Sequence, residues 1–266
     1  MTDTLHYDVR GSGPALLVIP GGSGHPMGLE RMTEALADRF TVIVHDPLGL
    51  AHGRLGLPVP EQRVQAWSDG ARRVLDEALP EGESAYVLGT SAGGIAALDL
   101  LARHPQRLRH VVAHEPPCVG VLPDGARHRA MFAEVYDTYR AAGLAAAAAR
   151  MTAGLAEERP EQPPAGEPLP PEEELADPMA LFLTRVLIPF TSYVPGPTGP
   201  TPLTVAAGTD SRGQLLYRTA ESTAARTRGD FVEFPGGHLG PLERPAEFAD
   251  RLARTLRPEP VTEAGT

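Results

Sequence analysis

Short apolar runs, bounded by glycine, proline or charged residues, alternate along this chain with longer stretches of helical spacing. Such runs are typical of strands that are buried on both faces of a parallel sheet. The pattern predicts strands at 5–9, 15–19, 40–45, 85–88, 108–113, 203–207 and 231–234. It predicts helices at 29–40, 61–79, 91–103, 214–226 and 246–256. Strands that alternate with helices in this way indicate an α/β fold with a mostly parallel, doubly wound sheet.

The alternation stops between 119 and 202, where no stretch has the pattern of a strand. An alanine-rich tract at 126–155 favours helix. The segment 157–178 is too rich in proline to pack as helix or sheet, and it precedes a strongly apolar stretch at 179–194. We therefore expect a core formed by 1–118 and 201–258, a helical, proline-rich insertion at 119–200 and a tail at 259–266.

The charge of the chain narrows the class of partner. Its 266 residues carry 24 basic and 34 acidic side chains, a formal net charge of −10. This length suits one α/β domain with a sizeable core, and the acidic balance argues against a nucleic acid or an anionic membrane as the partner. No apolar run approaches ~18 residues, and no basic-plus-apolar leader begins the chain. We expect a cytoplasmic protein that acts on a small-molecule substrate.

Missing residue types exclude several chemistries. The sequence has no lysine and no asparagine, so Schiff-base and pyridoxal-phosphate enzymes, Walker-type phosphate loops and Cys-His-Asn proteases lack a required residue. The single Cys118 excludes an intrachain disulfide and a cysteine-rich zinc site. His114-Glu115-Pro116-Pro117 is not H-E-x-x-H, because no second histidine follows. We therefore predict no metal and no cofactor.

A G-x-S-x-G pentapeptide, Gly89-Thr90-Ser91-Ala92-Gly93, lies between an expected strand and an expected helix. So sharp a turn strains its central residue, and side chains two positions away would collide with neighbouring groups. The turn lifts the serine hydroxyl clear of the sheet and places it at a helix N-terminus, which favours developing negative charge. Ser91 is therefore the candidate nucleophile, and an N-cap serine is the alternative.

A serine hydroxyl needs a base to accept its proton. Of nine histidines, His238 is the best placed, because it lies after the last expected strand and before the last expected helix. His25, His52 and His114 also lie at expected strand ends and are held in reserve.

Two carboxylates at expected strand ends could orient the imidazole of this histidine. Glu115 follows the strand at 108–113, and Asp210 follows the strand at 203–207. Only one of them can be the third member of a triad, and the residues alone leave both open.

Two backbone N–H groups are candidates for an oxyanion hole: that of Ala92, directly after the nucleophile, and that of Gly22, in the turn Gly21-Gly22-Ser23-Gly24. If the apolar segment 179–194 faces the sheet, it walls a largely apolar substrate pocket. The expected substrate-binding residues are Phe182, Val186 and Phe190, with Met179, Leu181, Leu187 and Tyr193 beside them.

These features together resemble the α/β-hydrolase superfamily over about 5–117 and 201–256. Their order is also similar: an oxyanion turn, a nucleophile elbow, an insertion in the lid position and a histidine before the last helix. By position, Ser91 resembles the nucleophile, His238 the general base, and Gly22 and Ala92 the oxyanion donors. The resemblance implies an α/β-hydrolase fold with a helical lid.

The chain departs from the superfamily pattern in three places. Thr90 stands where many members have histidine. The stretch 46–53 lacks the arginine, one glycine and the serine of D-x-R-G-x-G-x-S, so we expect a rearranged loop there. Members with the acid after the penultimate strand usually read G-x-x-D, which places it at Ser211 in this chain. A subset has its acid after the earlier strand, where Glu115 falls, and this places Glu115 slightly ahead of Asp210.

The first hypothesis is a serine hydrolase that cleaves an ester, thioester, lactone or amide of a small, fairly apolar molecule through a Ser-His-acid triad. The alternative keeps the fold but has lyase, cyclase or acyl-transfer chemistry in a biosynthetic pathway, with His238 as a base. A non-catalytic binding protein is the third possibility, and the presence of both Ser91 and His238 argues against it.

Overall fold

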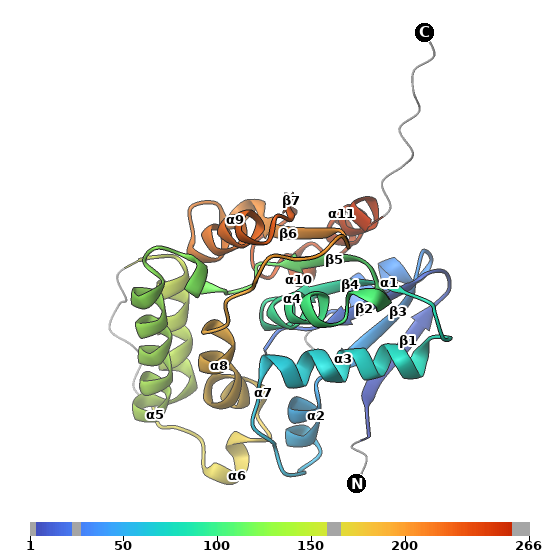
Figure 1. The fold of residues 1–266 in the computed structure, drawn as a ribbon. Helices are drawn as coiled ribbons and strands as arrows, with labels where there is room; N and C mark the ends of the chain where they lie inside the picture. The colour runs from blue at the N-terminus through green and yellow to red at the C-terminus, as the bar shows by residue number, and fades with distance from the viewer. Residues whose placement is uncertain (1–3, 23–27, 159–165, 257–266) are drawn as a thin grey trace.

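The structure, a computed structural model, describes residues 4–22, 28–158 and 166–256 (Figure 1). Its centre is a seven-stranded sheet of order β1-β3-β2-β4-β5-β6-β7. The strands are β1 (His6–Gly11), β2 (Ala15–Ile19), β3 (Thr41–Asp46), β4 (Ala85–Thr90), β5 (Leu108–His114), β6 (Leu203–Gly208) and β7 (Asp230–Phe234). β1 is antiparallel to β3, and the other neighbouring pairs are parallel. The prediction of an α/β fold with a mostly parallel sheet is confirmed.

Each face of the sheet has its own apolar core. Successive strand residues point to opposite faces, so Leu17 and Val87 pack under α3, α4 and α9, while Val18 and Leu88 pack under α1 and α11. Burial on both faces explains why these strands are continuous apolar runs. The covering helices are α1 (Glu30–Ala37), α3 (Val64–Ala78), α4 (Ala92–Arg103), α9 (Leu215–Thr227) and α11 (Pro245–Leu256).

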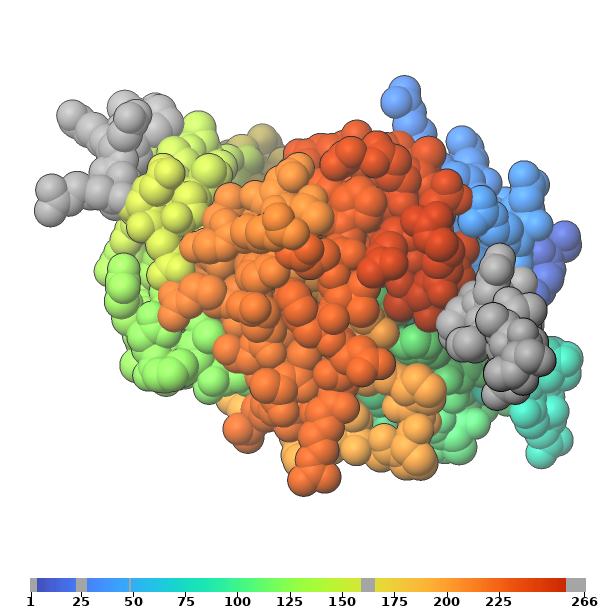
Figure 2. Space-filling model, turned by 90° about the horizontal axis from the view of Figure 1, so that it is seen from above, coloured from blue at the N-terminus to red at the C-terminus, as the bar shows by residue number. Residues whose placement is uncertain are grey.

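Between β5 and β6 the chain forms a group of helices at one end of the sheet (Figure 1). They are α5 (Gly125–Leu155), α6 (Pro171–Glu174), α7 (Pro178–Leu181) and α8 (Leu187–Thr191), with a 3-10 turn at Val119–Val121 and a π turn at Phe182–Val186. Gly143, with φ 77°, folds α5 into two arms. Seen from above, the green and yellow surface of α5 lies beside the orange surface of the segments after β6 (Figure 2). Among the described residues, 119–202 contains no strand, as predicted.

Three short helices differ from the prediction. The sequence predicts an irregular segment at 157–178, but its described part contains α6. Proline fits the first turn of a helix, where its missing N–H needs no partner, and Tyr139 and Arg140 hold Glu174 in place. The expected rearranged loop after β3 is a helix, α2 (Leu48–Arg54), and a short helix, α10 (Gly240–Glu243), follows the turn that carries His238.

Some expectations fall on parts of the chain that the structure does not describe. The predicted tail at 259–266, His25 and the Ser23-Gly24 part of the glycine-rich turn lie outside the described residues. Of the helices that are described, none combines the length and the apolar character needed to cross a bilayer.

Candidate active site

Ser91 lies at the tip of a sharp turn between β4 and α4. Its φ of 53° and ψ of −122° lie outside the regions that residues with a side chain normally occupy. The turn is possible because Gly89 and Gly93 approach backbone groups too closely for any side chain: a Cβ atom would collide with the carbonyl of Gly93 in the first case and of Ile19 in the second. The hydroxyl of Ser91 therefore stands at the N-terminus of a helix, at the carboxyl edge of the sheet.

Glu115 has a similar position on the neighbouring strand. It directly follows β5 and has a φ of 43°, which is uncommon for a residue with a side chain. Hydrogen bonds from strand to strand hold both residues: Ser91 N–H donates to His114 O (2.9 Å), and Glu115 N–H donates to Ala206 O (2.8 Å). The two strained residues thus extend the ladders that join β4, β5 and β6.

The carboxylate of Glu115 contacts the imidazole of His238. Glu115 Oε2 lies 2.9 Å from His238 Nδ1, and Glu115 Oε1 accepts the N–H of Gly208 (2.8 Å). Glu115 is fully buried, whereas the side chain of His238 is 29% exposed. An Nδ1–H donated to this carboxylate leaves Nε2 of His238 free to accept a proton.

The charge on Glu115 is stabilised despite its burial. Burial alone would raise the pKa of this carboxyl, but the hydrogen bond with His238, the charges of His114 and His238 and the Ser211 hydroxyl together lower it to about 2. Ser211 occupies the position where the superfamily pattern expects the acid, and in this chain its hydroxyl interacts with the carboxylate of Glu115 instead. The sequence gives Ser211 no role of its own, although the G-x-x-D spacing marks its position.

Asp210, the other candidate carboxylate, has different hydrogen-bond partners. Its side chain is exposed and accepts a hydrogen bond from Thr209 Oγ1 (3.2 Å), and its N–H donates to Gly236 O (3.0 Å). Among the described residues, the carboxylate that contacts His238 is that of Glu115 and not that of Asp210. Asp210 still lines the cavity described next.

Ser91 and His238 line one cavity of about 570 Å³, together with Gly22 and Ala92. Its wall is largely apolar. Phe182 lines this cavity, as does Phe190, whose ring packs on Trp67 with the centroids 4.6 Å apart. Other apolar residues of the wall include Phe132, Met151, Leu155, Met179, Leu187, Leu216, Leu239 and Leu242. Its polar lining residues other than Ser91 and His238 are Thr90, Thr152, Thr191, Asp210, Gln214 and Glu243, and no arginine is among the described lining residues.

Val186 does not line the cavity. This predicted substrate-binding residue is fully buried in the core that covers one face of the sheet. Leu181 and Tyr193 are likewise absent from the described lining, and Tyr193 donates to Asp99 instead (3.3 Å). The apolar segment 179–194 therefore divides its side chains between the cavity and the core, because a helical segment cannot turn every residue toward one side.

The reserve histidines have other surroundings. His52 Nδ1 lies 3.2 Å from Pro58 O on a partly exposed surface. His114 is fully buried against Phe234 and Phe248, and neither of its ring nitrogens has a hydrogen-bond partner among the described residues. Burial lowers the pKa of His114 to about 4, so its imidazole is neutral at physiological pH.

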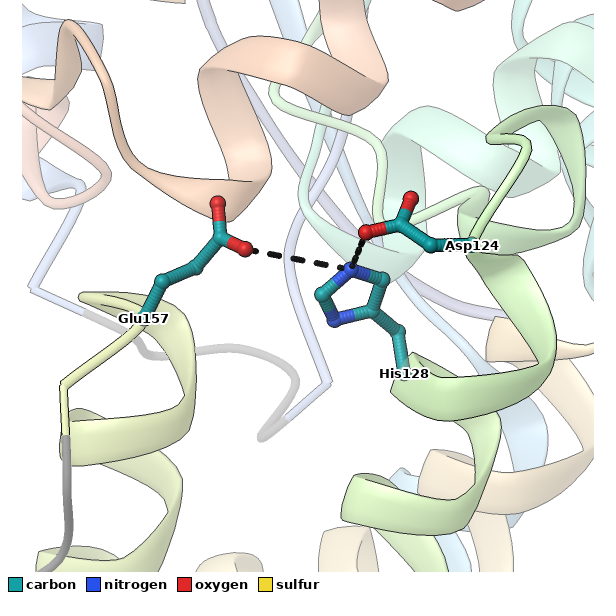
Figure 3. A group of neighbouring side chains, drawn as sticks. All are labelled: Asp124, His128 and Glu157. Carbon is teal, nitrogen blue, oxygen red and sulfur yellow. Dashed lines mark hydrogen bonds and ion pairs between the residues drawn. The ribbon is translucent and has the colours of Figure 1, made fainter.

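A second group of titratable residues lies where the beginning of the first arm of α5 approaches the end of its second arm (Figure 3). His128 Nε2 is 2.9 Å from Asp124 Oδ2 and 3.9 Å from Glu157 Oε1, a cluster of the size that could hold a metal ion. Arg218 of α9, however, contacts both carboxylates, at 3.0 Å from Asp124 and 2.7 Å from Glu157. Its guanidinium already compensates their charge, so we interpret the group as an ion-pair network that ties both arms of α5 to α9.

Comparison with known proteins identifies the family to which the chain is similar. Residues 16–251 match the alpha/beta hydrolase family. The chain is 30% identical over 264 residues to the uncharacterized hydrolase YraK of Bacillus subtilis, which covers 96% of this chain and 93% of that relative. It is 33% identical over 105 residues, 40% of this chain and 38% of the relative, to the putative carbamate hydrolase RutD of Azorhizobium caulinodans.

Two solved structures share the fold over nearly the whole chain. A thermophilic esterase from Thermogutta terrifontis has a TM-score of 0.68 at 18% identity, covering 95% of this chain and 93% of that one. The enol-lactonase from Burkholderia xenovorans has a TM-score of 0.60 at 16% identity, covering 95% of this chain and 96% of that one. At these identities the similarity establishes the fold alone.

Proposed function

The chain belongs to the alpha/beta hydrolase family of enzymes, and we propose that it is a serine hydrolase that cleaves an ester, thioester, lactone or amide of a small, fairly apolar molecule. The observation that carries this proposal is the 2.9 Å contact between buried Glu115 and His238, beside a strained Ser91 that lines the same cavity. An oriented base and a nucleophile that reaches a cavity at a helix N-terminus are two requirements of acyl transfer.

The proposed reaction proceeds through an acyl-enzyme. Ser91 Oγ attacks the carbonyl carbon while His238 Nε2 accepts the hydroxyl proton, and the N–H groups of Gly22 and Ala92 bind the oxyanion. Collapse of the tetrahedral intermediate breaks the bond to the leaving group, which takes the proton from His238. Water then attacks the acyl carbon, gives its proton to His238, and the second collapse returns that proton to Ser91 and releases the acid. Glu115 stays ionised and holds the Nδ1–H of His238 throughout.

The cavity supports a neutral substrate of modest size. Its volume of about 570 Å³ lies in the ordinary range for small-molecule sites, and its described wall is mostly aliphatic and aromatic. Asp210 and Glu243 line the cavity and no described arginine does, so a carboxylate or phosphate on the substrate would meet two like charges and no guanidinium of the described lining. A substrate without negative charge fits this lining.

We also propose that the insertion predicted at 119–200 acts as the lid of this cavity. Its helices supply Phe132 and Met151 from the two arms of α5 and Phe182 and Phe190 from the segment around α8. The reacting groups, by contrast, come from the carboxyl edge of the sheet. In this proposal the insertion at 119–200 is the lid, and 1–118 and 201–258 are the core.

Labelling with a fluorophosphonate probe tests the proposal. Wild type and Ser192→Ala, a control change at an exposed serine, should both be labelled. Ser91→Ala should not be labelled, and His238→Ala should be labelled far more slowly. Absence of labelling in folded wild type, or equal labelling of Ser91→Ala, contradicts the proposal. Turnover of a substrate that survives Ser91→Ala but not His238→Ala would instead indicate base-driven lyase or cyclase chemistry.

A further inference from the structure

The ring of Phe182 lies directly on Gly22. A Cβ atom added to Gly22 would collide with Cδ2 and Cε2 of that ring and would come within 2.9 Å of its Cγ. Gly22 is not among the described glycines with positive φ, so the backbone conformation does not demand glycine there. The close approach of the Phe182 ring requires glycine at this position. Both residues line the cavity that contains Ser91 and Ala92.

The local backbone directs Phe182 toward this glycine. The helix α7 begins at Asp177, whose carboxylate accepts the N–H groups of Met179 (2.9 Å) and Ala180 (2.8 Å). Phe182 then opens the π turn, which is uncommon and occurs often at functional sites. Leu183, the next residue, is buried in the cluster formed with α5. The wider turn therefore lets the chain keep its buried contacts while one aromatic ring reaches the cavity.

The rearranged loop after β3 supports the segment that carries Phe182. Its helix α2 packs closely against the end of α6 and against α7: a Cβ atom at Gly53 would collide with the carbonyl of Leu175, which follows α6, and lie 3.2 Å from Cδ2 of Leu181 in α7. Arg54 at the end of α2 pairs with Asp46, the last residue of β3, which fixes the helix to that strand. The helix α2, in the stretch that departs from the superfamily pattern, thus supports α7 and, through α7, Phe182.

We propose that Phe182 is a positioning residue for the oxyanion hole. This inference rests on the proposed function, since it concerns the N–H of Gly22 as an oxyanion donor. The ring restricts rotation of the Gly22 peptide and keeps water from its exposed side, so that the N–H stays directed toward the oxyanion. A donor of this kind acts mainly in the transition state, so Phe182 contributes to kcat more than to KM.

Steady-state kinetics with 4-nitrophenyl butanoate on the full chain test this role. Phe182→Ala should lower kcat by roughly 10- to 100-fold with KM changed less than about threefold, because loss of one oxyanion donor costs up to about 10²–10³ in kcat. Phe182→Leu, which refills most of the space over Gly22, should recover most of the loss. Met179→Ala is the matched control, because Met179 lines the cavity in the same segment, whereas the three atoms nearest to a Cβ at Gly22 all belong to Phe182. It should change KM alone.

Two further readouts separate positioning from simple substrate contact. Affinity for a boronic acid, which mimics the tetrahedral intermediate, should fall with kcat in Phe182→Ala. Gly22→Ala should cost more in wild type than in Phe182→Ala, because the added Cβ atom collides with the ring only when the ring is present.

The outcomes distinguish this inference from the proposed function. An unchanged kcat with a raised KM in Phe182→Ala, or additive effects of the two changes, would overturn the role of Phe182 while leaving Ser91 as nucleophile. Full turnover by Ser91→Ala would refute the proposed function and this inference together. A thermal unfolding midpoint for each variant establishes that the enzyme assayed is folded, and Phe182→Leu carries the test if Phe182→Ala does not fold.

Discussion

His114 makes the stability of the protein depend on pH, and His114→Leu tests how strongly. His114 is the last residue of β5. Its imidazole is fully buried, and the centroid of this ring lies 5.1 Å from that of Phe248 and 6.2 Å from that of Phe234. Burial lowers its pKa from 6.5 to about 4, and the charge of His238 adds to this effect while that of Glu115 opposes it. Leucine fills a similar volume and cannot take up a proton.

The magnitude follows from the two pKa values. Between pH 6.5 and about 4 the unfolded chain binds a proton at this position that the folded protein does not bind. The free energy of unfolding therefore decreases as pH falls through this window, and at about 1.4 kcal/mol for each pH unit the loss amounts to roughly 3 kcal/mol. His45, also buried with its pKa lowered to about 4, adds a similar loss in wild type.

Urea unfolding of wild type and His114→Leu, followed by circular dichroism between about pH 8 and pH 4, measures this difference. The variant should lose roughly 3 kcal/mol less than wild type over that range. At about pH 8 it should be as stable as wild type or more stable, because the substitution removes ring nitrogens that have no hydrogen-bond partner within the described part of the chain. His45→Leu serves as the parallel variant and should remove a similar share.

Two results would refute this reasoning. If His114→Leu and wild type lose stability in parallel as pH falls, the imidazole takes up its proton in the folded protein as easily as in the unfolded chain. If the variant is several kcal/mol less stable at about pH 8, the imidazole has a favourable polar interaction that burial alone does not describe.

Three further predictions concern the site and its support. Glu115→Gln should lower kcat/KM by roughly 10³–10⁴, whereas Asp210→Asn should change it less than about threefold, as measured with one aryl ester. Arg218→Met should lower the free energy of unfolding only modestly and should speed amide exchange in the second arm of α5, because Asp124 and Glu157 lose their shared partner. A neutral butanoate ester should exceed the corresponding hemisuccinate ester at least tenfold in kcat/KM, and equal rates would contradict the charge argument.

Much of the sheet could be predicted because each strand is a short apolar run that ends at a turn residue. The antiparallel pairing of β1 with β3 could not, because pairing is decided between segments that are distant in sequence. α2 contains two glycines, which disfavour helix, and it forms where Arg54 reaches back to Asp46. The bend of α5 at Gly143 could not be predicted either, because the alanine-rich sequence around it favours one continuous helix.

In the candidate site, too, some features could be predicted from the sequence and others could not. Ser91 and His238 follow from a local motif and from a place at a strand end, both of which are visible in the sequence. The partner of His238 depends on the register of β5 with β6 and on the left-handed conformation of Glu115, and neither is written in a short motif. Val186 was assigned to the pocket because an apolar segment does not reveal which of its residues point inward.

The separation of strand-end chemistry from a helical wall has a consequence for how such a protein can change over generations. All residues of the wall between β5 and β6 belong to one continuous stretch of chain, so a single recombination event can replace that stretch and leave β4, β5 and β7 untouched. Such an exchange would change much of the cavity wall and keep the residues at the strand ends. Phe182 belongs to the exchanged stretch yet rests on Gly22 outside it, so a new segment must bring its own group to cover that glycine.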